Sequence, residues 1–199
     1  MANVCCDDVY FFSETNPDGL RSLWEDLETS IVLHTNVDKA AIENLFKYKG
    51  IDTTKIGLRG TIEYMEWNED NILLSTSAAW SPLFDAYTVI ADVYGVNFVM
   101  QSTEPGSNLY INTDHTGIYF PDRYCISMDN EDLITPSGIR IGDKLEYGQP
   151  FVSSEALLMR FHDLGYEADS LEDLASILED SDIYIHAFED PYKPENQVA

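Results

Sequence analysis

The chain has 199 residues, of which 36 are Asp or Glu and 11 are Lys or Arg, so its formal net charge is −25. A surface this acidic disfavours contact with the phosphates of DNA or RNA and with anionic membranes. No apolar run approaches the roughly 20 residues of a membrane-spanning helix, while an apolar fraction of 44% is sufficient for a hydrophobic core. We therefore expect a folded protein that binds neither nucleic acid nor membrane directly.

The N-terminal residues and the cysteines indicate the cellular compartment of the protein. Residues 1–8 contain no basic region and no long apolar stretch, so we expect no signal peptide. The three cysteines, Cys5, Cys6 and Cys125, include one adjacent pair and make a poor disulfide framework. Reduced thiols are typical of the cytosol, and we expect a cytoplasmic protein.

Strands and helices alternate in the first two thirds of the chain. An apolar and aromatic run predicts a strand over 3–12, and Asn16-Pro17-Asp18 predicts the start of a helix. A second helix is expected over 38–49 and ends at Gly50, and a third follows Ser81-Pro82 and ends at Gly95. The remaining strands are expected over 61–67, 71–79, 96–102, 109–113 and 118–128, the first two forming a hairpin.

This order of elements is the split βαβ pattern of a ferredoxin-like α+β sandwich with added strands. The rest of the chain predicts a hairpin over 139–147, helices over 153–164 and 170–178, and a strand over 183–188. Ser170 is the expected cap of the second of these helices. We therefore expect a ferredoxin-like domain over 1–128, a small acidic C-terminal α/β extension packed on it over 129–190, and a flexible tail over 191–199.

Short motifs in the first domain carry a family resemblance. Trp80-Ser81-Pro82 opens a helix, and Glu104-Pro105-Gly106 and then Gly117 follow. Over residues 60–125 the chain resembles the YubB-like family, whose ferredoxin-like domain is carried by plasmids, phages and other mobile elements. The resemblance implies this fold and an accessory role for a mobile element, and it transfers no catalytic residue.

Residues with catalytic or metal-binding chemistry are scattered. Cys5 and Cys6 would point to opposite faces of a strand, and no His or Cys pair has the spacing of a metal site. Cys125 and His115 lie on opposite sides of an expected hairpin, which permits a nucleophile–base pair without favouring it. A small enzyme or ligand-binding domain with a pocket near Trp80, His115 and Cys125 is therefore the alternative hypothesis. No cofactor, no metal and no catalytic residue is assigned.

The charge distribution is the strongest functional signal, since no Lys or Arg occurs between Arg160 and Lys193. A compact chain of this length spans about 42 Å. Duplex DNA carries about 25 charges over about 42 Å of its axis, so the net charge of the chain is sufficient to imitate a DNA segment of the same length. We expect a non-enzymatic protein of a mobile element that occupies the basic nucleic-acid-binding surface of a host defence protein, such as a restriction or CRISPR effector. The expected contacts are the carboxylates, taken as helical, of Glu167, Asp169, Glu172, Asp173, Glu179, Asp180 and Asp182.

Two simpler interpretations remain beside it. The acidity could serve only solubility or adaptation to salt. The chain could also pair with a second copy through its edge strands and form a homodimer.

Overall fold

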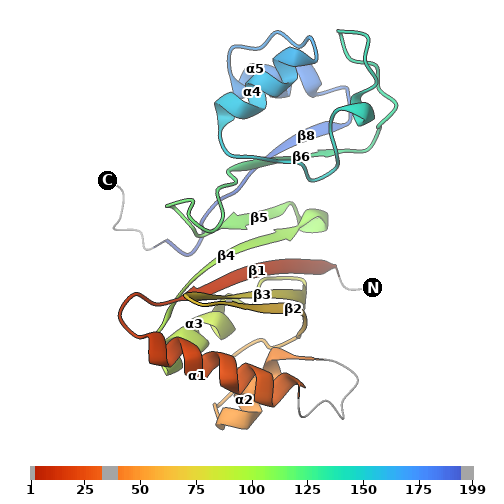
Figure 1. Ribbon diagram of the computed structural model, residues 1–199. Helices are drawn as coiled ribbons and strands as arrows, with labels where there is room; N and C mark the ends of the chain where they lie inside the picture. Colours follow the sequence, from red (N-terminus) through yellow and green to blue (C-terminus); the bar gives the residue numbers. More distant parts are fainter. Residues whose placement is uncertain (1–2, 33–39, 194–199) are drawn as a thin grey trace. The chain divides into compact units, whose positions relative to one another are not determined.

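The chain folds as α+β in two units, each with its own sheet and its own hydrophobic core. The computed structural model describes residues 3–32 and 40–193 (Figure 1). The first unit is Met1–Asp114 and the second is His115–Ala199.

The first unit contains a five-stranded antiparallel sheet in the order β2-β3-β1-β4-β5. Its central strand buries alternate residues such as Val9 and Phe11, as the pleat of a half-covered strand requires. β3 lies between β1 and β2, and β4 lies on the other side of β1. The bounds are β1 (Val4–Phe12), β2 (Gly60–Asn68), β3 (Asn71–Ala79), β4 (Asn97–Glu104) and β5 (Leu109–Asn112).

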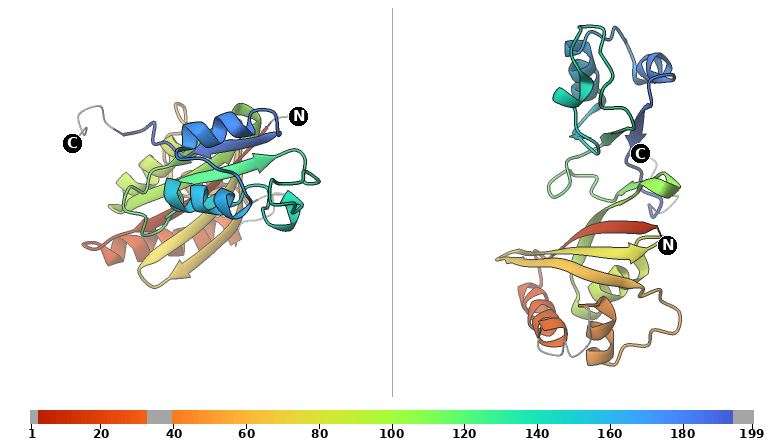
Figure 2. Two further views of the ribbon diagram at one scale, coloured as in Figure 1. Left: turned by 90° about the horizontal axis from the view of Figure 1, so that it is seen from above. Right: turned by 90° about the vertical axis from the view of Figure 1, so that its right-hand side faces the viewer.

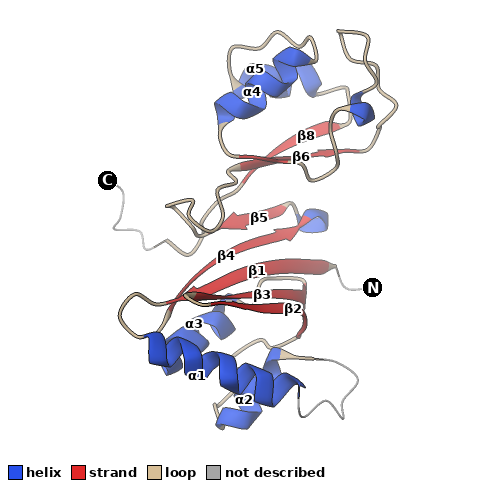
Figure 3. Cartoon of the chain, viewed as in Figure 1, coloured by secondary structure: helices blue, strands red, loops and turns tan. Residues whose placement is uncertain are grey.

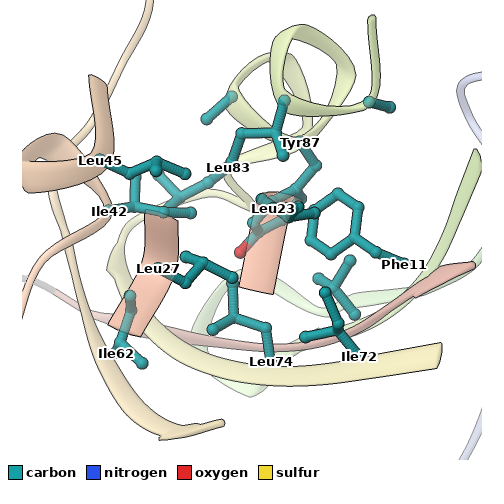
Figure 4. Packing of buried hydrophobic residues seen from close by; sticks show 14 of the residues in the cluster. Phe11, Leu23, Leu27, Ile42, Leu45, Ile62, Ile72, Leu74, Leu83 and Tyr87 are labelled. Atoms are coloured by element: carbon teal, nitrogen blue, oxygen red, sulfur yellow. The ribbon is translucent and has the colours of Figure 1, made fainter. Parts of the chain in front are cut away.

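Three helices cover one face of this sheet: α1 (Pro17–Leu27), α2 (Ile42–Lys49) and α3 (Phe84–Tyr94) (Figures 1 and 2). Their apolar stripes meet the sheet in one buried cluster, part of which Figure 4 shows. The predicted glycine caps are confirmed, since Gly50 and Gly95 adopt left-handed backbone conformations at the ends of α2 and α3. The third helix begins at Phe84, later than predicted, and residues 38 and 39 of the expected second helix lie outside the described residues.

The start of α1 is held against the end of α3 by Asn16. Its side-chain oxygen accepts a hydrogen bond from the N–H of Gly19 (3.0 Å), and its amide group donates one to the carbonyl oxygen of Tyr94 (3.0 Å). A Cβ atom on Gly19 would lie only 2.2 Å from that same carbonyl oxygen. The two helices therefore approach each other at a point where only glycine fits.

The start of α3 is held against the sheet by Asp7, which is 1% exposed. The Asp7 carboxylate accepts hydrogen bonds from the N–H of Leu83 (3.0 Å), the hydroxyl of Tyr87 (2.8 Å) and the hydroxyl of Ser102 (2.8 Å). These donors come from α3, from the residue before it and from β4. One buried charge is thus satisfied by groups that only the folded topology brings together.

The second unit contains a three-stranded antiparallel sheet in the order β7-β6-β8, with two helices on one side (Figure 3). Its elements are β6 (Tyr124–Met128), β7 (Pro150–Phe151), α4 (Ser154–Asp163), α5 (Leu171–Leu178) and β8 (Ile183–Ala187). Its core includes Ile126 of β6, Leu157 of α4 and Leu174 of α5. Ser170 caps α5 as predicted, because its hydroxyl accepts a hydrogen bond from the N–H of Asp173 (3.1 Å).

One predicted strand begins too early, and one predicted hairpin is wrong. The strand expected over 118–128 begins only at Tyr124, after a segment that contains Gly117 at φ 72° and Pro121, which lacks an N–H donor. The hairpin expected over 139–147 is a short 3-10 helix, Ile141–Asp143. Ile141 and Leu145 are both buried, and because they are four residues apart they would share a face in a strand as well as in a helix.

The boundary between the parts also differs from the expected one at residue 128. β6 pairs with β7 and β8 and so belongs to the second unit, which begins at His115. Of the expected tail over 191–199, residues 194–199 lie outside the described residues.

Candidate functional site

The seven carboxylates predicted as partner contacts lie in the second unit, and all seven are exposed. We call the stretch that carries them, residues 167–182, the acidic segment. The prediction that they are helical is wrong for most of them, because only Glu172 and Asp173 belong to α5, in its first turn. Two precede the helix and three follow Leu178, where it ends; the last of these, Asp182, has φ 55°.

No carboxylate of the acidic segment forms an ion pair with another residue in the described part of the chain. The flanking Arg160 directs its guanidinium to the carbonyl oxygen of Lys144. Arg140, elsewhere in the same unit, pairs with Asp132 (2.8 Å) and Asp143 (3.5 Å). The negative charges of the acidic segment are therefore not neutralised by these neighbouring bases.

Exposed apolar residues accompany these charges. α5 buries Leu174 and Leu178, while Ile177 on its outer side is 46% exposed. Ile177 follows Asp173 by four residues, so the two side chains are neighbours on the helix surface. Protein interfaces combine apolar contacts with a polar rim, and this pairing has that composition.

The candidate nucleophile Cys125 is buried on β6, directly opposite His186 of β8. No hydrogen bond in the described residues joins Cys125 to His115 or to His186. Burial and the nearby Asp122 raise the pKa of the Cys125 thiol to about 12, so the thiol stays protonated near neutral pH. Among the residues that the structure describes, no histidine is hydrogen-bonded to this cysteine.

Both histidines have other partners. The Nε2 atom of His115 lies 2.8 Å from Oδ2 of Asp190, and that of His186 lies 2.8 Å from the hydroxyl of Ser127. Burial lowers the pKa of His186 below its usual value. Trp80 belongs to the first unit and His115 and Cys125 to the second, so neither unit by itself contains the pocket expected around these three residues.

Two of the motif residues of the family resemblance, Trp80 and Gly106, lie beside Asn3, just before β1. The N–H of Trp80 donates a hydrogen bond to the carbonyl oxygen of Asn3 (3.1 Å). A Cβ atom on Gly106 would lie 2.6 Å from the Asn3 amide nitrogen and 2.8 Å from a carboxylate oxygen of Glu104. Ser81 and Pro82 precede α3 by a few residues, whereas Gly117 is in the second unit.

A pocket of about 360 Å³ lies beside these motif residues, at the start of β1. The sequence alone does not predict this pocket, because the residues that line it come from three separate strands and the residues next to them. The sequence feature that could have indicated the pocket is Arg59. It directly precedes a strand, and no other Lys or Arg follows it until Arg123. The lining residues are Asn3, Val4, Arg59, Gly60, Thr61, Ser77, Ala78 and Ala79.

Within residues 3–32 and 40–193, His, Cys, Asp and Glu side chains form no group of three or more that could hold a metal ion. The helices in the same ranges lack the length and apolar character needed to cross a membrane. Comparisons of the chain with protein families, with curated proteins and with solved structures found no match.

Proposed function

We propose that the protein is a non-enzymatic acidic binder whose acidic segment occupies the basic, nucleic-acid-binding surface of a partner protein. The observation that carries the proposal is that seven carboxylates within 16 residues are exposed and have no ion-pair partner in the described chain. A DNA duplex likewise presents closely spaced negative charges to the proteins that bind it. Such a surface speeds association with a basic partner, and the attraction weakens as salt is added.

Exposed apolar residues of the second unit support a protein partner over a purely solvating role. Ile177 lies next to Asp173 on α5, and Tyr184 of β8 is 49% exposed. Charge alone is sufficient to keep a protein in solution. A binding surface also gains free energy when a partner covers its apolar residues and removes them from water.

We further propose that the first unit is ferredoxin-like. Its strand order β4-β1-β3-β2, with β5 added beside β4 and the helices on one face, supports this assignment. We also propose, from the sequence resemblance to the YubB-like family, that the chain is carried by a mobile element. With that origin, the partner is a host defence protein and the location is the cytoplasm.

An enzyme that uses Cys125 as its nucleophile is the weaker candidate, because a thiol with a pKa of about 12 is almost entirely protonated at neutral pH. A homodimer formed through edge strands is compatible with either function. β2 is one edge of the larger sheet, and its outward carboxylates Glu63 and Glu66 disfavour pairing with a second β2. Sedimentation velocity tests for the dimer.

Capture from a nuclease-treated bacterial lysate at low salt tests the binding function. The test variant carries Glu167→Lys, Asp169→Lys, Glu179→Lys and Asp180→Lys, all outside α5. The control variant carries Glu14→Lys, Glu25→Lys, Glu28→Lys and Asp92→Lys at exposed positions of the first unit. Each set raises the net charge by 8, from −25 to −17, so that the two variants differ only in where the charge is removed.

We expect the wild-type protein and the control variant to retain one nucleic-acid-binding protein in stoichiometric amount, released by a gradient to about 0.5 M salt. The test variant should lose it. Identical profiles for all three baits would contradict the proposal and would assign the acidity to solvation.

A further inference from the structure

The pocket of the first unit has the size and lining of a small-molecule site. Its volume of about 360 Å³ falls within the range of about 300–1,000 Å³ that is usual for ligand pockets. The lining combines one cation, Arg59, and the polar side chains of Asn3, Thr61 and Ser77 with apolar groups such as those of Val4 and Ala79. Such a site can orient a ligand by its polar groups and contact the ligand's apolar part on one side.

Arg59 is the charged group of this pocket. Its carbonyl oxygen accepts a hydrogen bond from the N–H of Ala79 (3.0 Å), which fixes its backbone at the rim of the sheet. Its side chain is exposed and forms no ion pair with a described residue, although the chain carries 36 carboxylates. A guanidinium presents its N–H donors in a planar fork that matches the two oxygens of a carboxylate.

The hydroxyl groups in the pocket come from neighbouring strands. Thr61 of β2 pairs directly with Ser77 of β3, so both side chains lie on the same face of the sheet. The hydroxyl of Thr61 donates a hydrogen bond to Glu63 (2.8 Å). Glu63 is the first acidic residue after Arg59 in the sequence, and its carboxylate is hydrogen-bonded to Thr61.

The apolar side of the site has an exposed aromatic residue beside it. Val4 pairs with Ala79 across β1 and β3 and is 54% exposed. Trp80, which follows Ala79, is 53% exposed and has φ 76°, and its N–H donates a hydrogen bond to the carbonyl oxygen of Asn3. A bulky residue in this left-handed region is strained, and strain of this kind is concentrated at ligand sites.

We propose that this pocket binds a small organic monocarboxylate with an apolar or aromatic substituent. Its carboxylate pairs with Arg59, and its substituent rests on Val4 and Ala79 near Trp80. One guanidinium balances one negative charge, whereas a dianionic phosphate would bring a second, uncompensated charge to an already acidic protein. This site lies in the first unit and does not depend on the function proposed for the acidic segment.

Titration of the full chain with phenylacetate, followed through backbone amide resonances by NMR, tests the assignment. Phenylacetate should produce saturable shifts centred on Val4, Thr61, Ser77 and Ala79. Phenylacetamide, which has the same shape without the charge, should bind at least about tenfold more weakly. Phenyl phosphate should also bind more weakly, because it brings a second negative charge to an acidic protein.

Two arginine variants test whether Arg59 is the residue that binds the carboxylate of the ligand. Arg59→Gln should weaken phenylacetate binding about tenfold and leave distant resonances unchanged. The control, Arg21→Gln, removes an exposed arginine from α1 of the same unit and should bind as the wild type does. Absence of saturable shifts, equal binding of phenylacetamide, or full binding by Arg59→Gln would overturn the site. Tighter binding of phenyl phosphate would overturn the monocarboxylate assignment.

Discussion

The carboxylate of Asp7 on β1 accepts a hydrogen bond from the backbone N–H of Leu83, 3.0 Å away at the start of α3. Leu83 is the N-cap residue of that helix, and no side chain of the helix itself supplies the capping acceptor. The cap comes instead from a strand 76 residues earlier in the chain. The same contact fixes the position of Trp80-Ser81-Pro82, which lead into α3.

Asp7→Asn should destabilise the first unit by about 3 kcal/mol, because it removes a buried charge and adds a donor that faces five others. The donors to the Asp7 carboxylate come from Cys5, Thr76, Leu83, Tyr87 and Ser102. The exposed neighbour Asp8, which accepts from the Ser75 hydroxyl (2.5 Å), provides the control. Asp8→Asn should cost less than about 1 kcal/mol. Urea unfolding followed by tryptophan fluorescence reports on this unit alone, since all three tryptophans precede residue 115. Equal losses in the two variants would contradict the capping role.

Gly19→Ala should also destabilise the first unit, by about 2 kcal/mol. Alanine favours a helix over glycine by about 1 kcal/mol, but the new methyl group would meet the Tyr94 carbonyl oxygen at 2.2 Å. Gly57→Ala is the matched control, because a Cβ atom there has no neighbour within 4 Å. The same fluorescence measurement should place the control within about 0.5 kcal/mol of the wild type. A neutral or stabilising Gly19→Ala would show that α1 and α3 are not in close contact.

The three cysteines should differ sharply in their rate of alkylation. Cys6 is exposed, whereas Cys5 and Cys125 are buried. With a pKa of about 12, Cys125 is a thiolate in only about one part in ten thousand at pH 8. Iodoacetamide at pH 8 should therefore label Cys6 first in the native protein, and Cys6→Ser should label slowly until denaturant is added. Rapid labelling of native Cys125 would restore the enzyme hypothesis.

His186 should make the second unit less stable as the pH falls from 7 to 5. Burial lowers the pKa of His186 in the folded chain, so the unfolded chain takes up the proton more readily as the pH falls. His186→Gln removes this proton uptake and keeps a polar partner for Ser127. Calorimetry should therefore show a smaller loss of stability on acidification in the variant than in the wild type. Parallel pH profiles would contradict the lowered pKa.

Local pattern was sufficient for most elements of the fold. The alternation in β1 and the glycines at 50 and 95 were visible in the sequence, and the structure confirms them. The turn over 141–143 differs from the predicted hairpin, because Ile141 and Leu145, both buried and four residues apart, would share a face in either structure. Short apolar stretches of this kind fit either period.

Long-range contacts could not be predicted in the same way. Asp7 meets Leu83 and Ser102 only because β1 lies between β3 and β4. The pocket around Arg59 depends on the same strand order. The sequence did identify the acidic segment, but it could not show that its carboxylates are exposed on loops around a short helix rather than along one.

The most direct test of the central claim is competition for the captured partner. A labelled DNA duplex bound to that partner is titrated with the wild-type protein, and its fluorescence anisotropy is recorded. If the acidic segment occupies the nucleic-acid-binding surface, one equivalent of protein should displace the duplex, and the variant with lysines at 167, 169, 179 and 180 should not. A complex that holds protein and duplex together, or equal displacement by that variant, would contradict the account.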